Sequence, residues 1–252
     1  MTKKYELVLD DTISLWGWKL FRIRALISFG SVEVGDLGGY IQKEENLSHD
    51  DNAWVSGDAK VWGNAKVWGN AEVWGNAKVS GNAEVSGNAK VWGNAKVSGN
   101  AKVSGNAEVS GNAKVWGNAK VSGNAEVWGD AKVWGNAEVS GNAKVWGNAE
   151  VSGNAEVWGD AKVWGDAEVW GNAEVSGNAK VWELGDIIVF KNHWSSGRHF
   201  TYTKSNKMWK VGCFYGTGQE LIEKAYRDSE KSGNYYKAYV DFVETLERLS
   251  EE

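Results

Sequence analysis

Hydrophobic and polar residues alternate with a strict six-residue period from Ala53 to Trp182. In each period alanine and valine stand two residues apart, and valine occupies every sixth position from Val55 to Val181. Strand alternation sends Ala and Val to one side, and Lys or Glu, with the Trp or Ser after Val, to the other. The Gly-Asn or Gly-Asp pair that closes each period tolerates the positive φ of a tight corner. The pattern therefore predicts a mainly β protein, a β-solenoid of short strands around a narrow Ala/Val interior.

This order of residues resembles the hexapeptide repeat of left-handed parallel β-helices throughout residues 53–182. Proteins of that family fold three hexads into one triangular coil, so the resemblance implies 18-residue coils. A flatter solenoid with two hexads per coil is the alternative, because neither an 18- nor a 12-residue shift aligns the choice of Trp or Ser clearly better. With three hexads per coil, the repeat predicts about seven coils that each rise about 4.8 Å, hence a rod of about 35 Å.

Three hexads per coil place the residues that follow valine in three outward columns, one on each face. An exposed aromatic strip commonly marks an interaction site. The alternative is that large aromatic residues suit a solvent-facing β-surface, where Lys and Glu stems cover them. The second face carries four tryptophans among serines, and the third face is mostly serine. The candidate interaction strip lies on the first face and consists of Trp74, Trp92, Trp128, Trp146, Trp164 and Trp182, of which the last four are expected to stack.

Residues 1–52 predict a β cap over the backbone that a parallel solenoid leaves unpaired at its end. Leu7 and Leu9 alternate with less buried positions as in a strand, and further strand-like runs follow. Ile41 and Leu47 already stand six residues apart, which indicates degenerate first hexads. A two-residue slip then sets the frame of the regular repeat.

Residues 183–252 predict a small α+β capping or interaction domain with three strands and two helices. Thr217-Gly-Gln-Glu220 is a capping box that opens the first helix, and Gly233 is expected to end it. The strands are expected at 186–194, 198–205 and 208–214. The apolar stripe of the second helix is expected to contain Tyr235, Tyr239, Phe242, Val243, Leu246 and Leu249.

The segments before and after the repeat make the resemblance to hexapeptide-repeat proteins more specific. The leader at 37–48, LGGYIQKEENLS, resembles that of hexapeptide-repeat proteins of bacteria and their phages, the YdcK-like group. The tail at 207–220, KMWKVGCFYGTGQE, is similar to tails of phage and prophage members. The resemblance covers nearly the whole chain. It implies the fold and a phage or mobile-element origin, and it implies no particular activity.

Residues 53–182 contain no histidine, no threonine and no insertion. Acyltransferases of this fold use a catalytic histidine and a loop outside the coil, carbonic anhydrases need three histidine ligands, and ice-binding solenoids would present threonine ladders. His49, beside Asp50 and Asp51, is interpreted as a turn residue rather than a cation ligand. Gly216-Thr-Gly218 is also a candidate phosphate loop, but the capping box explains the same residues. We expect no enzyme, no catalytic residue, no metal and no cofactor.

The net charge of −5 is mild and forms no basic patch, so nucleic acid is not an expected partner. The single cysteine, Cys213, is expected in a buried strand and is compatible with a reducing compartment. No apolar run is long enough to span a membrane. These features favour a scaffold or spacer in the cytoplasm (of a bacterial host, if phage-encoded) that forms homo-oligomers and presents its ends or Trp columns to a partner. The alternative is a binding module for a host protein or for an aromatic, nucleotide or carbohydrate ligand.

Overall fold

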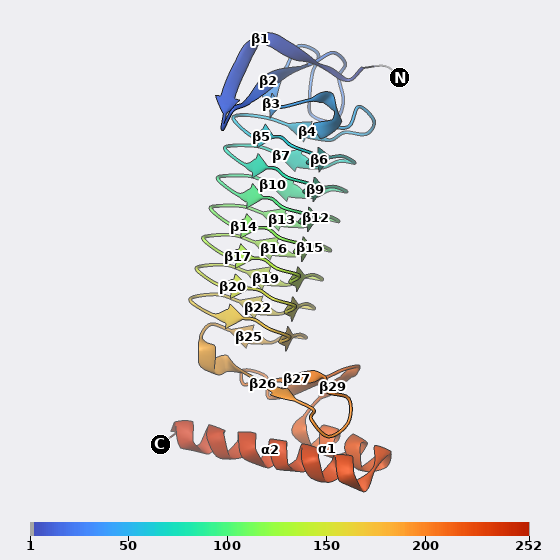
Figure 1. The fold of residues 1–252 in the computed structure, drawn as a ribbon, viewed down its shortest axis with the longest axis vertical. Coiled ribbons are helices and arrows are strands. Elements are labelled where there is room, and N and C mark those ends of the chain that lie inside the picture. Colours follow the sequence, from blue (N-terminus) through green and yellow to red (C-terminus); the bar gives the residue numbers. More distant parts are fainter. Residues whose placement is uncertain (1–2, 252) are drawn as a thin grey trace.

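The computed structural model describes residues 3–251 and shows a parallel β-solenoid with a folded cap at each end (Figure 1). Its strands pair with strands 18 residues away. Val97, for example, pairs with Val79 on one side and with Val115 on the other. Each coil therefore contains three hexads. The triangular arrangement is confirmed, and the alternative with two hexads per coil is wrong.

The three hexads of a coil lie on three parallel sheets, which we call the first, second and third faces. The first face consists of β4 (Trp54–Val55), β7 (Glu72–Val73), β10 (Lys90–Val91), β13 (Glu108–Val109), β16 (Glu126–Val127), β19 (Lys144–Val145), β22 (Lys162–Val163) and β25 (Lys180–Val181). The second face contains β5 (Lys60–Val61), β8 (Lys78–Val79), β11 (Lys96–Val97), β14 (Lys114–Val115), β17 (Lys132–Val133), β20 (Glu150–Val151) and β23 (Glu168–Val169). The third face consists of β6 (Lys66–Val67), β9 (Glu84–Val85), β12 (Lys102–Val103), β15 (Lys120–Val121), β18 (Glu138–Val139), β21 (Glu156–Val157) and β24 (Glu174–Val175).

Alanine and valine side chains fill the interior of the solenoid. All of them from Ala53 to Val181 are buried, with at most 1% of their surface exposed. This confirms the predicted inward columns. A narrow triangular interior accommodates the methyl group of alanine beside the stiff, branched side chain of valine, so that the core repeats the same close-packed layer in every coil.

Glycine at the corners is required for two separate reasons. At Gly117 the backbone φ is 73°, in the left-handed region that L side chains rarely adopt. A Cβ atom added there would lie 3.0 Å from both the N and the O atom of Gly135 in the next coil. The corner thus needs a residue that turns left-handed and also lets the next backbone approach.

Asparagine side chains at the corners form hydrogen-bonded ladders from coil to coil. In the ladder beside the second face, each Nδ2 donates to the Oδ1 of the asparagine 18 residues later, at 2.9–3.2 Å. At its N-terminal end Lys43 Nζ donates to Oδ1 of the first asparagine. We call this the Asn64 ladder, and it consists of Asn64, Asn82, Asn100, Asn118, Asn136, Asn154 and Asn172.

The N-terminal cap is a hairpin that continues into the second face. The hairpin consists of β1 (Tyr5–Leu15) and β2 (Trp18–Ala25), and β3 (Leu37–Ile41) lies antiparallel to β2 and parallel to β5. The 3-10 helix η1 (Glu44–Asn46) follows. Ile41 pairs with Val61 and Leu47 bridges to Val67, so the predicted degenerate hexads do form a first coil.

The first coil exposes backbone carbonyls, because the N–H groups of each coil donate to carbonyls of the next one. Side-chain donors of the N-terminal cap occupy these carbonyls. Lys4 Nζ donates to the carbonyls of Asp51 and Ala53 at 3.2 and 2.8 Å. The Tyr5 hydroxyl donates to the carbonyl of Leu47 at 2.8 Å. The cap therefore satisfies acceptors that would otherwise be buried without a partner.

The last coil exposes N–H groups instead, and the C-terminal cap supplies acceptors. Thr201 Oγ1 accepts from the backbone N–H of Glu174 at 2.9 Å, and Ser205 Oγ accepts from that of Lys180 at 2.8 Å. The Tyr215 hydroxyl packs on Gly177, where the glycine of a following coil would otherwise lie. The two caps thus complete the solenoid with opposite chemistry, donors at one end and acceptors at the other.

The C-terminal domain begins after the 3-10 helix η2 (Leu184–Asp186) with an antiparallel sheet of four strands rather than the predicted three. Gly212, with φ 56°, turns the chain after the third strand and lets it pair again. Cys213 lies exposed in this turn, and its expected place in a buried strand was wrong. The strands are β26 (Ile187–Lys191), β27 (His199–Thr203), β28 (Met208–Val211) and β29 (Phe214–Gly216).

Helices α1 (Gly218–Asp228) and α2 (Glu230–Glu251) cover the side of this sheet that faces away from the solenoid (Figure 1). The capping box of Thr217 and Glu220 is confirmed. Gly233 does not end a helix, contrary to expectation, because it lies inside α2. A Cβ atom there would lie 2.2 Å from the ring of Tyr226 on α1, so glycine permits the close approach of the two helices.

The buried stripe of α2 differs from the predicted one. Tyr236, Val240 and Val243 are buried, and of these only Val243 belongs to the predicted stripe. These three residues stand at i, i+4 and i+7 and face the sheet. The close contact between the helices fixes the rotation of α2 about its axis. As a result the predicted stripe residues Phe242, Leu246 and Leu249 lie exposed.

Candidate functional site

The tryptophans of the candidate strip stack along the first face. Trp74 and Trp92 are parallel within 1°, with ring centroids 4.9 Å apart. Trp128, Trp146 and Trp164 form a second stack with centroid distances of 5.0 Å and interplanar angles of 2° and 7°. The strand spacing of a β-sheet sets this distance. The columns inferred from the repeat therefore exist as indole stacks, separated by the serine at position 110.

The strip ends with a ring that leaves the stack. Trp182 is 5.6 Å from Trp164, at an interplanar angle of 40°, so four parallel rings were expected and three are found. The cause lies in the chain that follows, where Asp186 Oδ2 accepts from the backbone N–H of Trp182 at 2.7 Å and redirects it. Trp182 is 46% exposed, whereas the parallel rings cover each other and are half-buried. The strip thus presents ring edges to solvent more than ring faces.

The second face combines a tryptophan pair with lysines. Trp116 and Trp134 are parallel within 6°, with centroids 5.1 Å apart. The strands beside them begin with lysine in five consecutive coils, in parallel register. A groove of about 460 Å³ follows this face along the lysines and the tryptophan pair. We call these five residues the lysine ladder: Lys60, Lys78, Lys96, Lys114 and Lys132.

This ladder was not predicted from the sequence. Elsewhere in the repeat, both opposite and like charges are neighbours between coils: Lys102 and Glu84 form an ion pair at 3.3 Å, whereas Glu108 and Glu126 lie side by side. The ladder is distinguished by its five consecutive lysines. Burial lowers the pKa of Lys60. The carboxylate of Asp58 opposes this shift, and the neighbouring charge of Lys78 adds to it. A comparison of lysine and glutamate positions at a period of 18 residues, once three hexads per coil are assumed, would have found the ladder.

The N-terminal hairpin covers the upper part of the second face. Trp62 is buried, and Trp16 in the hairpin turn packs on it edge-to-face at 5.7 Å. Trp16 also lies under Lys78, whose Nζ is 5.9 Å from its ring centroid. Trp62 therefore belongs to the cap. The open part of the lysine ladder begins at Lys96.

The lower end of the second face carries an exposed apolar groove. Trp170 and Leu184 are 64% and 63% exposed and line a groove of about 570 Å³ between the last coils and β26. Val189 and His199 complete its wall. Trp170 is more exposed than any ring of the first-face strip, although the predicted candidate strip does not include it.

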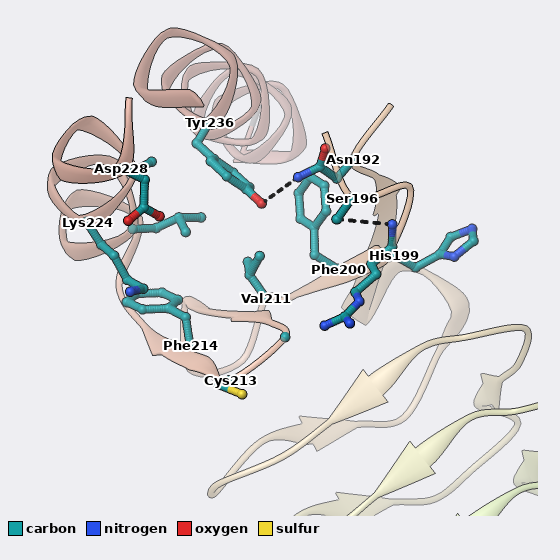
Figure 2. A pocket seen from close by; sticks show the side chains of 14 residues that line it. Asn192, Ser196, His199, Phe200, Val211, Cys213, Phe214, Lys224, Asp228 and Tyr236 are labelled. Atoms are coloured by element: carbon teal, nitrogen blue, oxygen red, sulfur yellow. Dashed lines mark hydrogen bonds between the residues drawn. The ribbon is translucent and has the colours of Figure 1, made fainter. Parts of the chain in front are cut away.

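A smaller cavity of about 240 Å³ lies inside the C-terminal domain, between its sheet and the two helices (Figure 2). The Nδ2 of Asn192 donates to the Tyr236 hydroxyl at 3.1 Å, and the Oδ1 of Asn192 accepts from the backbone N–H of Ser195 at 2.9 Å. Phe200 and Leu221 supply apolar walls. The buried amide of Asn192 is thus engaged in holding the turn between β26 and β27, and the cavity is a gap in the packing of sheet and helices.

His49, beside the turn at Asp50 and Asp51, packs against the N-terminal cap. His49 stacks on Tyr5 with ring centroids 4.2 Å apart, and its Nδ1 accepts from the backbone N–H of Lys4. The ammonium group of Lys4 itself occupies the carbonyls of the turn at Asp50 and Asp51. Burial lowers the pKa of Lys4 to about 8, and the two carboxylates counteract part of this shift. The ammonium group of Lys4 therefore lies directly against this turn.

Within residues 3–251 we find no cluster of three His, Cys, Asp or Glu side chains with the arrangement of a metal site. In the same part of the chain no helix has the length and apolarity needed to cross a bilayer.

The repeat, the three parallel sheets and the capped ends define the protein as a hexapeptide-repeat β-solenoid. The sequence matches none of the protein-family models, and a search of the curated proteins also gives no match.

Proposed function

We propose that the protein is a non-enzymatic scaffold or spacer that holds its two end caps apart and associates with further copies of itself. The observation that carries this proposal is the uninterrupted run of equivalent coils from β4 to β25, with a folded cap at either end. The coils differ only at outward and corner positions, and their inward layers are the same throughout. In such a repeat architecture the number of coils sets a length without altering any site.

Self-association would use the tryptophan strip of the first face. Its parallel rings expose their edges as a flat, narrow apolar surface from Trp128 to Trp164, and Trp182 adds a more exposed ring. The same strip of a second copy would cover this surface, and each indole would contribute a few kcal/mol at most (on the order of 1 to 3). The resemblance to YdcK-like proteins supports a bacterial or phage origin and therefore action in the bacterial cytoplasm.

The test replaces four tryptophans of the strip, Trp128, Trp146, Trp164 and Trp182, by serine, which the repeat already uses at this position. The variant should keep its β-sheet circular dichroism spectrum and show a smaller mass than the parent by light scattering. A control with Trp116 and Trp134 replaced by serine should keep the parent mass. An unchanged mass of the fourfold variant, or a parent that is monomeric at high concentration, would rule out association through this strip.

The second candidate function is a binding module for a host protein, favoured by the exposed groove at Trp170 and Leu184. An exposed apolar groove of this size commonly marks a protein contact. Trp170→Ser together with Leu184→Ser should then abolish the recovery of a partner from the native host. Trp158→Ser, on the third face, is the matched control. Equal recovery of a partner by the parent, the double variant and the Trp158→Ser control would contradict this function.

A further inference from the structure

The open part of the lysine ladder carries positive charge that the protein itself does not neutralise. Lys96 and Lys114 are exposed, and neither has an ion-pair partner among the described residues. They are neighbours in parallel register, so their charges repeat at the strand spacing of about 4.8 Å. Like charges directly opposite one another on adjacent strands destabilise a sheet. The ladder would therefore gain from an external anion.

The ladder has a defined length. Above Lys96 the N-terminal hairpin covers it, where Trp16 lies under Lys78. Below, Lys132 Nζ donates to Glu150 Oε1 at 2.6 Å, and the acidic side chain ends the run of positive charge. The accessible stretch spans only three coils. This length suits a small anion with a few charges and is too short for a polymer.

The tryptophan pair beside the ladder has two uncovered ring faces. That of Trp134 is directed toward Ser152, which stands beside Glu150, whereas that of Trp116 lies beside the open lysines. Trp116 stacks on Trp134 from one side. On its other side the preceding coil carries Ser98, because Val97 pairs with Val115 and the residues after them are aligned. A third indole at this position would continue the stack, as Trp146 does between Trp128 and Trp164. Serine leaves its place empty, and the groove of about 460 Å³ opens there.

We propose that this groove binds a nucleoside phosphate, with the base stacked on Trp116 at the level of Ser98 and the phosphates on Lys96 and Lys114. Lys114 begins β14 and Trp116 directly follows it, on either side of the inward Val115, so the alternation of side chains directs both outward, side by side. A ligand that joins a planar ring to two or more negative charges matches this pair of columns. Stacking of bases on aromatic side chains and phosphate contacts with lysine are the usual elements of such recognition.

On the first face, the open stack position at Ser110 lacks one of the two elements. Ser110 lies between Trp92 and Trp128. The strand residue beside it is Glu108, whose in-register neighbours are Lys90 and Glu126. A ring could stack there, but phosphates would meet carboxylates. This makes Ser110 the matched control for Ser98.

The experiment measures binding of ATP, GTP, CTP and UTP to the full chain by isothermal titration calorimetry and by quenching of tryptophan fluorescence, in EDTA and at low salt. At least one nucleotide should bind. Adenosine or the matching nucleoside, and inorganic tripolyphosphate, should each bind at least about tenfold more weakly, because each lacks one of the two contacts. Failure of all four nucleotides to bind, or equal binding of tripolyphosphate, would overturn the proposal.

Three variants locate the site. Ser98→Trp should fill the open position with an indole of the protein and weaken nucleotide binding at least about tenfold. Lys114→Glu, which introduces the residue that the same column carries at Glu150, should do the same. Ser110→Trp should retain the parent affinity. An equal loss in Ser98→Trp and Ser110→Trp, or no loss in Ser98→Trp, would refute the assignment. Circular dichroism checks the fold of each variant. Light scattering measures the mass of the same variants and so tests self-association, on which the scaffold proposal depends, separately from nucleotide binding.

Discussion

The side-chain nitrogen of Asn172 lies 3.2 Å from Nδ1 of His199, which joins the last asparagine of the Asn64 ladder to the first residue of β27. Asn172 Oδ1 already accepts from Asn154, so Nδ2 is the atom left to donate. His199 Nδ1 must then accept, and its proton belongs on Nε2. The Asn64 ladder thereby fixes the tautomer of His199 in the C-terminal cap.

This relationship predicts the tautomer of the His199 ring. Heteronuclear NMR of the imidazole nitrogens should show that the neutral ring carries its hydrogen on Nε2. His199→Ala should lower the free energy of unfolding by about 1 kcal/mol, the usual contribution of one hydrogen bond. Amides of β27 should also exchange faster. A proton on Nδ1 would contradict the direction of the hydrogen bonds along the Asn64 ladder.

The second prediction concerns Lys4, whose ammonium group binds carbonyls of the first coil. Lys4→Met leaves these carbonyls without a donor and should lower the free energy of unfolding by about 1 to 3 kcal/mol at pH 7. Urea unfolding of parent and variant provides the measurement. Lys120→Met, at an exposed site on the third face, is the control and should have a much smaller effect.

The cost of Lys4→Met should also depend on pH. The folded pKa of Lys4 is about 8, below its ordinary value of 10.5, so between these values the unfolded chain holds more protons than the folded one. The parent therefore gains stability from this group as the pH rises from 8 to 10. Burial raises the pKa of Tyr5, so its opposing effect begins only above pH 10. The difference between parent and variant should widen from pH 7.5 to 9.5. A constant or shrinking difference would argue against the buried ammonium group.

The third prediction separates the two requirements on corner glycines. Gly171 has φ 70°, almost the same as Gly117, but a Cβ atom added at Gly171 would have no atom within 4 Å. Gly171→Ala should therefore lower the free energy of unfolding by about 1 to 2 kcal/mol, the cost of the left-handed conformation alone. Gly117→Ala should cost more because its methyl group also meets the backbone of the next coil. Equal losses in the two variants would show that coil stacking does not restrict the corner.

The fourth prediction uses the period of the coil. Deletion of residues 107–124 removes one coil, leaves the hexad pattern intact and brings Trp92 beside Trp128. The two indole stacks of the first face should then merge and strengthen the exciton signal in the near-ultraviolet circular dichroism spectrum. Small-angle scattering should show a rod shorter by about 4.8 Å.

Deletion of residues 107–118 is the control for this experiment. It removes two hexads, so every later residue moves to a different face relative to the N-terminal cap. Trp92 and Trp128 should then lie on different faces and the exciton signal should not increase. A stronger signal in the control than in the 18-residue deletion would contradict the three-hexad coil.

The inward direction of every alanine and valine could be predicted because each inward position carries one residue type, whereas three hexads per coil followed only from the resemblance. Ala and Val at fixed spacing leave a single way to bury them, and the structure follows it from Val55 to Val181. The outward surface was harder. The self-covering of the indoles depends on side-chain orientation, and the burial of Trp62 depends on a hairpin distant in sequence. Neither leaves a mark on the local pattern.

The caps were predicted in kind but not in detail. Capping boxes have a short-range signature, so Thr217 and Glu220 were recognised from sequence. Gly233 has a role that comes from tertiary contact, because it permits the approach of Tyr226 from another helix. A glycine that ends a helix and a glycine at a helix crossing look the same in one sequence. The extra strand β29 follows a turn at Gly212. The sequence pattern there was interpreted as one continuous strand over 208–214.

The donors of the N-terminal cap and the acceptors of the C-terminal cap also bear on filament growth. A bare stack of parallel coils is a template that can recruit another chain at either end, as amyloid fibrils do. In this protein the caps occupy part of both templates, through Lys4 and Tyr5 at one end and through Thr201 and Ser205 at the other. The caps therefore oppose the addition of another chain along the axis of the solenoid. Loss of either cap would turn a rod of fixed length into the seed of a fibre.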